Sequence, residues 1–141
     1  MKKARNTFLL LNLTWGLLMN IIGGAVAFCL LSIGKRPTRY GDCLCFTVGK
    51  GRDGVSFGLV MIVGCESSIN TKNHEHGHAV QNALFGVFMP FIVGIPSVAR
   101  YWHFTIAEKR GKAGTLPPYD SAWFERQATR WGNEYVDRFG D

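Results

Sequence analysis

The chain has 141 residues, which is enough for one small domain. A hydrophobic fraction of 47% and a charged fraction of 18% exclude an intrinsically disordered protein. The net charge of +6 does not indicate nucleic-acid binding, because the basic residues border uncharged apolar stretches, as they do at the flanks of membrane segments.

The first apolar stretch, residues 7–33, contains no charged residue. Its 27 residues exceed the roughly 20 that a helix needs to cross a bilayer. The stretch therefore predicts an N-terminal transmembrane helix within a membrane domain over residues 1–36, which could be loosened at Gly23 and Gly24. Basic residues at both ends leave its orientation open, with a slight preference for a cytoplasmic N-terminus.

A cleaved signal peptide is the alternative for this segment. Lys2, Lys3 and Arg5 could form its basic start, and the A-V-A sequence at residues 25–27 resembles a cleavage site. However, the apolar stretch continues past that point to Ile33, which makes it too long for the core of an ordinary signal peptide. We therefore favour a retained helix.

Two segments further along the chain have the composition of β-strands. Residues 43–48 and 54–64 are rich in β-branched and aromatic side chains, and residues 49–54 between them have the composition of a turn. Together they predict a β-hairpin.

The chain has four cysteines and no C-x-x-C pair. Cys43 or Cys45 could form a disulfide with Cys65. Reduced, buried cysteines without a functional role are the simpler interpretation.

A helix is predicted after the strands. The polar connector at residues 67–73 offers several N-caps, of which Asn70 and Thr71 are the best. The helix should end just before Gly86, because glycine is a common residue at helix C-termini.

Glycines and prolines interrupt residues 86–97 and predict a bend or a re-entrant turn rather than a plain helix. A helix should resume over residues 97–108, followed by a loop over residues 111–118. The last helix should cover residues 120–138, with either of its first two residues as the cap.

The most informative motif lies on the helix that follows residue 73. His74, Glu75 and His78 fit the pattern H-E-x-x-H. On a helix, positions i and i+4 share one face, so the two histidines can bind one metal ion. Glu75 points to the neighbouring face, where it can accept a proton from a metal-activated water. His76 faces away from the ligands and should lie at the surface or support them from outside.

A catalytic zinc site needs a third protein ligand. We favour Glu125, because small residues lie three, four and seven positions after it, at Ala128, Thr129 and Gly132. These positions share one helical face with the glutamate. A smooth face would let this helix lie close to the histidine helix, so that a short carboxylate side chain reaches the metal.

The pair of motifs, H-E-x-x-H and the later E-x-x-A from Glu125 to Ala128, resembles the gluzincin metallopeptidases. It is most similar to the compact minigluzincin core of membrane-embedded prenyl-protein and heat-shock peptidases. The run HEHGHAVQ, followed by G-I-P-S at residues 94–97, also resembles small uncharacterised bacterial membrane proteins that read H-E-Y-G-H-x-x-Q. The resemblance covers residues 54–135.

This resemblance implies a zinc ion, Zn²⁺, held by His74, His78 and Glu125. It also implies that Glu75 is the general base for peptide-bond hydrolysis. Such peptidases commonly carry an aspartate four residues after the glutamate ligand, where it orients a histidine. In this chain Thr129 stands at that position.

Two further roles in such a site have several candidates. Asn133 or Asp120 could replace the missing aspartate. The residue that stabilises the oxyanion could be His103, Tyr119 or Tyr135.

The sequence thus predicts a mainly α membrane protein with a small β-hairpin. An N-terminal transmembrane helix should precede a compact zincin-like domain over residues 37–141, which consists of the active-site helix, a re-entrant or interfacial segment and a C-terminal helix. Because the three ligands must lie within about 2 Å of one ion, the membrane-associated segment 84–104 should dip into the bilayer and return, or lie at its interface.

The predicted function is that of a membrane-anchored zinc metallopeptidase in the bacterial inner membrane. Its predicted partners are the lipid bilayer and a peptide or protein substrate, together with a second copy or a partner subunit to complete the substrate cleft. The alternative is a small membrane protein that binds zinc or a partner without catalysis.

Overall fold

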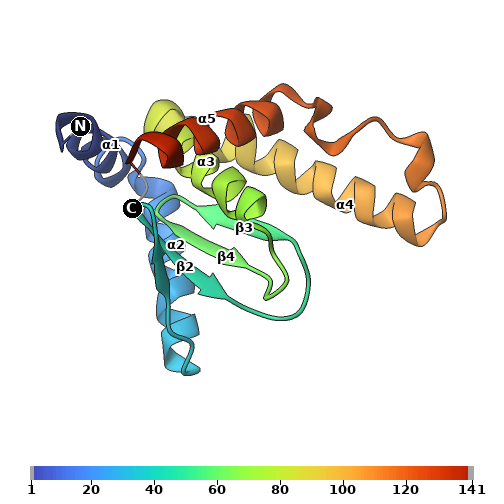
Figure 1. Cartoon of the computed structure of the whole chain (residues 1–141), viewed down its shortest axis with the longest axis horizontal. Helices are drawn as coiled ribbons and strands as arrows, with labels where there is room; N and C mark the ends of the chain where they lie inside the picture. Colours follow the sequence, from blue (N-terminus) through green and yellow to red (C-terminus); the bar gives the residue numbers. More distant parts are fainter. Residues whose placement is uncertain (1, 140–141) are drawn as a thin grey trace.

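The computed structural model describes residues 2–139, which form a mainly helical protein with one small mixed sheet (Figure 1). Short 3₁₀ and π turns connect some of the helices. The main elements in chain order are α1 (Lys2–Leu13), α2 (Leu17–Ser32), β1 (Thr38–Tyr40), β2 (Cys43–Thr47), β3 (Gly54–Phe57), β4 (Val60–Val63), α3 (Ile69–Phe85), α4 (Ile95–Lys109) and α5 (Trp123–Phe139).

The sheet has the strand order β1-β2-β4-β3, in which β2 and β4 are parallel and the other pairs are antiparallel. The predicted hairpin between residues 43–48 and 54–64 is therefore wrong in its pairing. The second of these segments contains two strands rather than one, because the chain reverses at Gly58, where φ is +64°. The side chain of Asn20 accepts a hydrogen bond from the Leu59 amide beside this turn, at 2.8 Å.

Helices cover both faces of the sheet. Cys43, Cys45, Met61 and Val63 point to one face, where they pack with Phe8 of α1 and with Ala79 and Ala83 of α3. Phe46 and Val60 point to the other face and pack against Ala27 of α2. The sheet is thus enclosed between α2 and α3, and the N-terminal helices belong to the same core as the rest of the chain.

The single helix predicted over residues 7–33 is instead two helices, and the chain breaks at residues 14–16 rather than at Gly23 and Gly24. The break follows from contacts with α3. The side-chain amide of Asn82 donates to Asn12 Oδ1 at 2.8 Å and to the Gly16 carbonyl at 3.0 Å. The bond to Gly16 gives a hydrogen-bond partner to a backbone carbonyl at the break between the two helices.

No single helix among residues 2–139 is both long enough and apolar enough to cross a membrane. Two pairs of consecutive helices reach the required length and hydropathy together, but each pair is sharply bent. The bend is 81° between α1 and α2, and 117° between residues 69–88 and 90–109.

The predicted break after α3 is confirmed. This helix ends at Phe85, and Gly86 follows with φ of +57°. The predicted N-cap residues, Asn70 and Thr71, are wrong, because Ser68 caps the helix and accepts a hydrogen bond from the Thr71 amide. Between α3 and α4, a 3₁₀ turn and a π turn replace the plain helix, and a helix then resumes at Ile95.

All four cysteines are free. Cys43 and Cys45 are buried in the sheet, whereas Cys29 on α2 and Cys65 before α3 are exposed.

His76 lies in the core, which corrects the expectation that it lies at the surface. Its side chain is fully buried and stacks between the rings of Phe8 and Tyr135, with centroid distances of 5.7 and 4.7 Å. Burial lowers the pKa of His76 to about 4, although the charge of Asp42 acts in the opposite direction.

We therefore expect His76 to make the fold sensitive to acid. In the unfolded chain a histidine binds its proton near pH 6.5, but in the folded chain His76 does so only near pH 4. Between these values the unfolded chain binds more protons, so stability falls as the pH falls, by roughly 3 kcal/mol in total. A His76→Leu variant should show a correspondingly flatter dependence of its unfolding free energy on pH, measured on metal-free protein. Parallel curves for the two proteins would contradict this assignment.

Candidate metal centre

The centre forms where α3 and α5 approach each other without intervening side chains. A Cβ atom added at Gly77 of α3 would lie 1.8 Å from the Ala128 carbonyl oxygen, and one added at Gly132 of α5 would lie 1.8 Å from the Asn73 carbonyl oxygen. Ala128 itself is fully buried. The small residues predicted to form a smooth face on α5 thus lie directly against the histidine helix.

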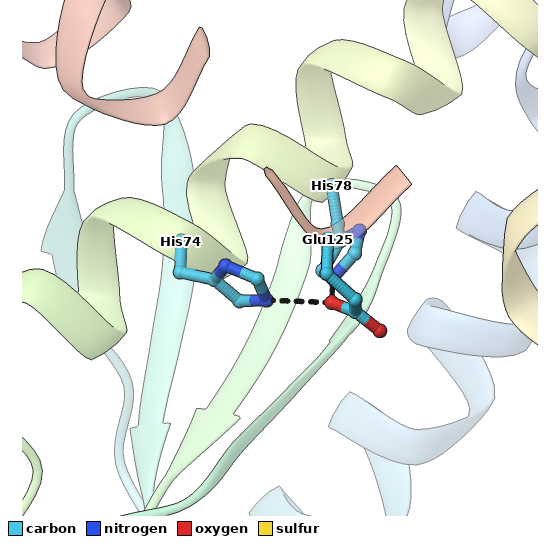
Figure 2. Close-up of side chains that lie close together, drawn as sticks. All are labelled: His74, His78 and Glu125. Carbon is cyan, nitrogen blue, oxygen red and sulfur yellow. Dashed lines mark ion pairs between the residues drawn. The ribbon is translucent and has the colours of Figure 1, made fainter. Parts of the chain in front are cut away.

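This close approach brings His74, His78 and Glu125 together (Figure 2). Glu125 Oε2 lies 3.0 Å from His74 Nε2 and 3.5 Å from His78 Nε2. One ligand atom from each residue can be chosen so that all three lie within 4.8 Å of one another. The group could therefore hold a metal ion, and it consists of the three residues that the sequence predicted as ligands.

The ring orientation of His74 is fixed by Thr129. His74 Nδ1 lies 2.8 Å from the Thr129 hydroxyl, which donates its one proton to the Glu125 carbonyl at 3.2 Å. The hydroxyl must then accept from His74, so Nδ1 carries the proton and Nε2 presents a lone pair. Thr129 thereby takes the orienting role for which Asn133 and Asp120 were candidates.

Gln81 fixes His78 in the same way. The Gln81 amide nitrogen donates to the Phe124 carbonyl at 2.8 Å, which determines the orientation of the amide. Its oxygen then faces His78 Nδ1 at 2.8 Å and can only accept. His78 Nε2 is therefore also left with a lone pair directed at Glu125.

Two imidazole lone pairs and a carboxylate oxygen thus face one another. Glu125 is fully buried, and its Oε2 atom has no hydrogen-bond donor among the described residues. Three acceptors at this distance repel one another unless a cation lies between them. Ligands of tetrahedral zinc at about 2 Å lie about 3.3 Å apart, and the two nitrogen–oxygen distances lie on either side of that value. The donor set fits zinc.

The second oxygen of Glu125 is held by α4. The Ser97 hydroxyl donates to Glu125 Oε1 at 2.6 Å, which leaves Oε2 as the oxygen that faces the histidines. Burial alone would raise the pKa of Glu125, but in the metal-free protein the hydrogen bonds from His74 and His78, which require a proton on Nε2, outweigh it and lower the pKa. The carboxylate is therefore ionised and ready to bind a cation at neutral pH.

Glu75 lies next to the ligands but is not one of them. It is buried, and it packs against Gly54 of the edge strand β3, where a Cβ atom would lie 2.7 Å from Glu75 Cγ. Burial raises the pKa of Glu75, and the nearby His78 and His74 offset only part of this effect. A carboxylate of raised basicity beside the metal group is suited to accept a proton.

Tyr119 is the oxyanion candidate that lies near the ligands. Burial raises the pKa of its hydroxyl to about 12, with a further contribution from the charge of Glu125. A hydrogen bond with Ser97 lowers the pKa of Tyr119, and one with Glu125 raises it. The hydroxyl stays protonated at neutral pH and can donate a hydrogen bond.

The other candidates lie elsewhere. Tyr135 donates to Asp42 at 2.9 Å on the far side of α3, and the side chain of Asn133 accepts from Asn73 at 2.8 Å. His103 is exposed on α4 beside Phe104. Gln81 and Ser97 were not predicted, although both lie in the segments that carried the resemblance, HEHGHAVQ and G-I-P-S.

The metal group is largely buried, and His74 is its most exposed member. Of the ligand side chains, His74 is 19% exposed, His78 10% and Glu125 0%. A hollow of about 270 Å³ lies on the outer side of α3 and α5 and is lined by Val80, Leu84, Trp131, Glu134, Tyr135 and Arg138. These lining residues do not include the metal group.

No protein-family profile matches this sequence, and no curated protein or solved structure matches it at a significant level.

Proposed function

We propose that this chain is a zinc metallopeptidase of the gluzincin type that hydrolyses peptide bonds in a peptide or protein substrate. One observation carries the proposal. The lone pairs of two imidazoles and a carboxylate oxygen converge on one point, their other atoms are held by Thr129, Gln81 and Ser97, and the buried carboxylate of Glu75 lies beside them.

Each residue then has a distinct role. His74, His78 and Glu125 would hold the zinc ion. When bound, zinc polarises a substrate carbonyl and activates a water molecule. Glu75 accepts the proton of that water and passes it to the leaving amine, as a general base followed by a general acid. Tyr119 can donate its hydroxyl proton in a hydrogen bond to the carbonyl oxygen as negative charge develops there.

The Glu75→Gln variant tests this assignment. Because Glu75 is not a ligand, the variant should keep the zinc content of the wild type, but it should lose at least 100-fold in cleavage because an amide cannot accept the proton. Zinc is measured by elemental analysis, and cleavage with a library of fluorescence-quenched peptides. The wild-type rate should also fall at acidic pH, as Glu75 becomes protonated at its raised pKa.

Equal cleavage by the wild type and the Glu75→Gln variant would overturn the general-base role. Asp53 provides a control for the loss of a nearby carboxylate, because it lies near Glu75 in the β2–β3 loop and is not part of the metal group. The Asp53→Asn variant should retain both zinc and cleavage.

A second candidate function is a non-catalytic zinc protein. The burial of His78 and Glu125 favours it, because structural zinc sites are closed whereas catalytic sites keep an open position. Stoichiometric zinc combined with no cleavage by the wild type would favour this candidate over the peptidase.

A further inference from the structure

A large apolar surface lies outside the metal centre. Among the residues whose side chains the structure describes, 25 large hydrophobic side chains are exposed. Eleven lie within residues 10–33 and ten within residues 84–106, so 21 of the 25 belong to two segments. Phe28 on α2 is 72% exposed, and Phe91 before α4 is 65% exposed. Soluble monomers rarely expose contiguous apolar surface on this scale.

The two segments form one surface because they touch at their bends. The Trp15 ring, at the corner between α1 and α2, packs edge-on against Phe88, at the corner between α3 and α4, with 6.0 Å between centroids. Trp15 Nε1 also donates to the Leu84 carbonyl at 3.2 Å. From this shared corner α2 and α4 extend in different directions (Figure 1), so their outer faces spread over an area rather than enclose a groove.

The inner face of α2 is already occupied by the sheet. A Cβ atom at Gly23 would lie 2.3 Å from the Phe57 carbonyl oxygen, so strand β3 lies directly against the helix. This strand is an edge of the sheet, and sheet edges do not occur in contact with lipid hydrocarbon. The helix can therefore face lipid only with its outer side, as a helix that lies in the plane of a membrane surface does.

Basic residues stand at the outer ends of the apolar surface. Lys35 and Arg36 follow α2, and Lys109, Arg110 and Lys112 end or follow α4; all five are exposed. For a spanning helix, basic residues at both ends give conflicting signals of orientation. For helices that lie at one membrane surface there is no conflict, because every basic end contacts the same anionic headgroups.

We propose that the outer faces of α2 and α4, with the corner at Trp15 and Phe88, bind one face of an anionic lipid bilayer without crossing it. Lipid fits this surface better than a protein partner does, because residues 7–33 and 79–99 carry no charge on any side. Protein interfaces end in a polar rim, whereas here the exposed charges of α2 and α4 lie at or beyond their C-terminal ends. Arg100, inside α4, is only partly exposed and donates to the Tyr119 and Pro118 carbonyls. The proposal does not depend on the zinc chemistry.

Two native cysteines provide the first test. Cys29 lies exposed on α2, and Cys65 lies exposed in the loop before α3. In the wild-type protein bound to vesicles of phosphatidylcholine and phosphatidylglycerol, a water-soluble maleimide should label Cys65 and leave Cys29 unlabelled. Cysteines introduced at Lys3 and Lys35, in a Cys29→Ser and Cys65→Ser background, should both be labelled from the same side of sealed vesicles. Labelling from opposite sides would mean that the segment spans the membrane and would overturn the proposal.

Charged substitutions provide the second test. Phe28→Glu and Phe91→Glu should each weaken binding to these vesicles at least tenfold, whereas Val55→Glu, an exposed position on β3 outside the surface, should not change it. Circular dichroism and thermal unfolding check that each variant is folded. A wild type that forms dimers protecting Cys29 and does not bind vesicles would show that a second copy covers the surface, and the lipid proposal would be wrong.

Discussion

Replacement of Glu125 by glutamine is expected to remove zinc from the protein while the fold persists. Glutamine keeps the shape of the side chain, and its oxygen can still accept the hydrogen bond from Ser97. Its amide nitrogen then faces the histidines and cannot bind a metal. We expect zinc affinity to fall by more than the 10- to 100-fold that is typical when an outer-shell partner of a metal ligand is lost.

The metal-free protein should respond in the opposite direction. In the wild type without metal, the lone pairs of His74 and His78 face the Glu125 carboxylate, an arrangement that is stable only if a histidine takes up a proton. This is why contacts with Glu125 and Glu75 raise the pKa of His78 even though burial acts to lower it. The amide of the Glu125→Gln variant can donate to these lone pairs directly. The metal-free variant should therefore be at least as stable as the metal-free wild type at pH 8, by thermal unfolding.

Two further variants on α5 provide a comparison for the zinc affinity of Glu125→Gln. Thr129→Val removes the hydroxyl that accepts from His74 Nδ1, and zinc affinity should fall by about 10- to 100-fold. Glu134→Gln breaks only an exposed ion pair with Arg130 and should leave zinc affinity unchanged. Full retention of zinc by Glu125→Gln would show that Glu125 is not a ligand.

The grouping of His74, His78 and Glu125 could be predicted because its signal is local to each helix. The i, i+4 spacing of His74 and His78 defines one face of α3, and the small residues after Glu125 define one face of α5. The supporting role of Thr129 was harder to foresee. A hydroxyl can accept the proton of His74 Nδ1 as a carboxylate would, but only the observed geometry shows that its own proton is used elsewhere.

The break between α1 and α2 and the strand pairing could not be predicted, because both depend on contacts between distant residues. Residues 7–33 read as one apolar helix, yet Asn82 meets Asn12 across 70 positions and satisfies the open backbone at Gly16. The turn at Gly58 is supported by Asn20, which lies 39 positions before its partner Leu59. An apolar composition indicates that a segment leaves water, but not whether it enters lipid or a protein core.

The close contact between α3 and α5 leads to a further prediction of large effect. A Gly132→Ala substitution places a methyl group 1.8 Å from the Asn73 carbonyl oxygen, which belongs to the backbone and cannot rotate away. The helices must separate, and such overpacking costs about 1–3 kcal/mol, of which the roughly 1 kcal/mol that alanine gains over glycine in a helix offsets only part. The same separation draws Glu125 away from the histidines, so stability and zinc affinity should fall together.

Gly24→Ala is the matched control for this substitution. Gly24 is also helical and exposed, and a Cβ atom there would have no neighbour within 4 Å. This variant should be as stable as the wild type or more stable, with unchanged zinc binding. A Gly132→Ala protein that unfolds at the wild-type denaturant midpoint and binds zinc normally would mean that α3 and α5 are not in contact through this glycine. The carboxylate could then not reach the two imidazoles from α5, since the distance between α3 and α5 depends on the absence of a side chain at Gly77 and Gly132.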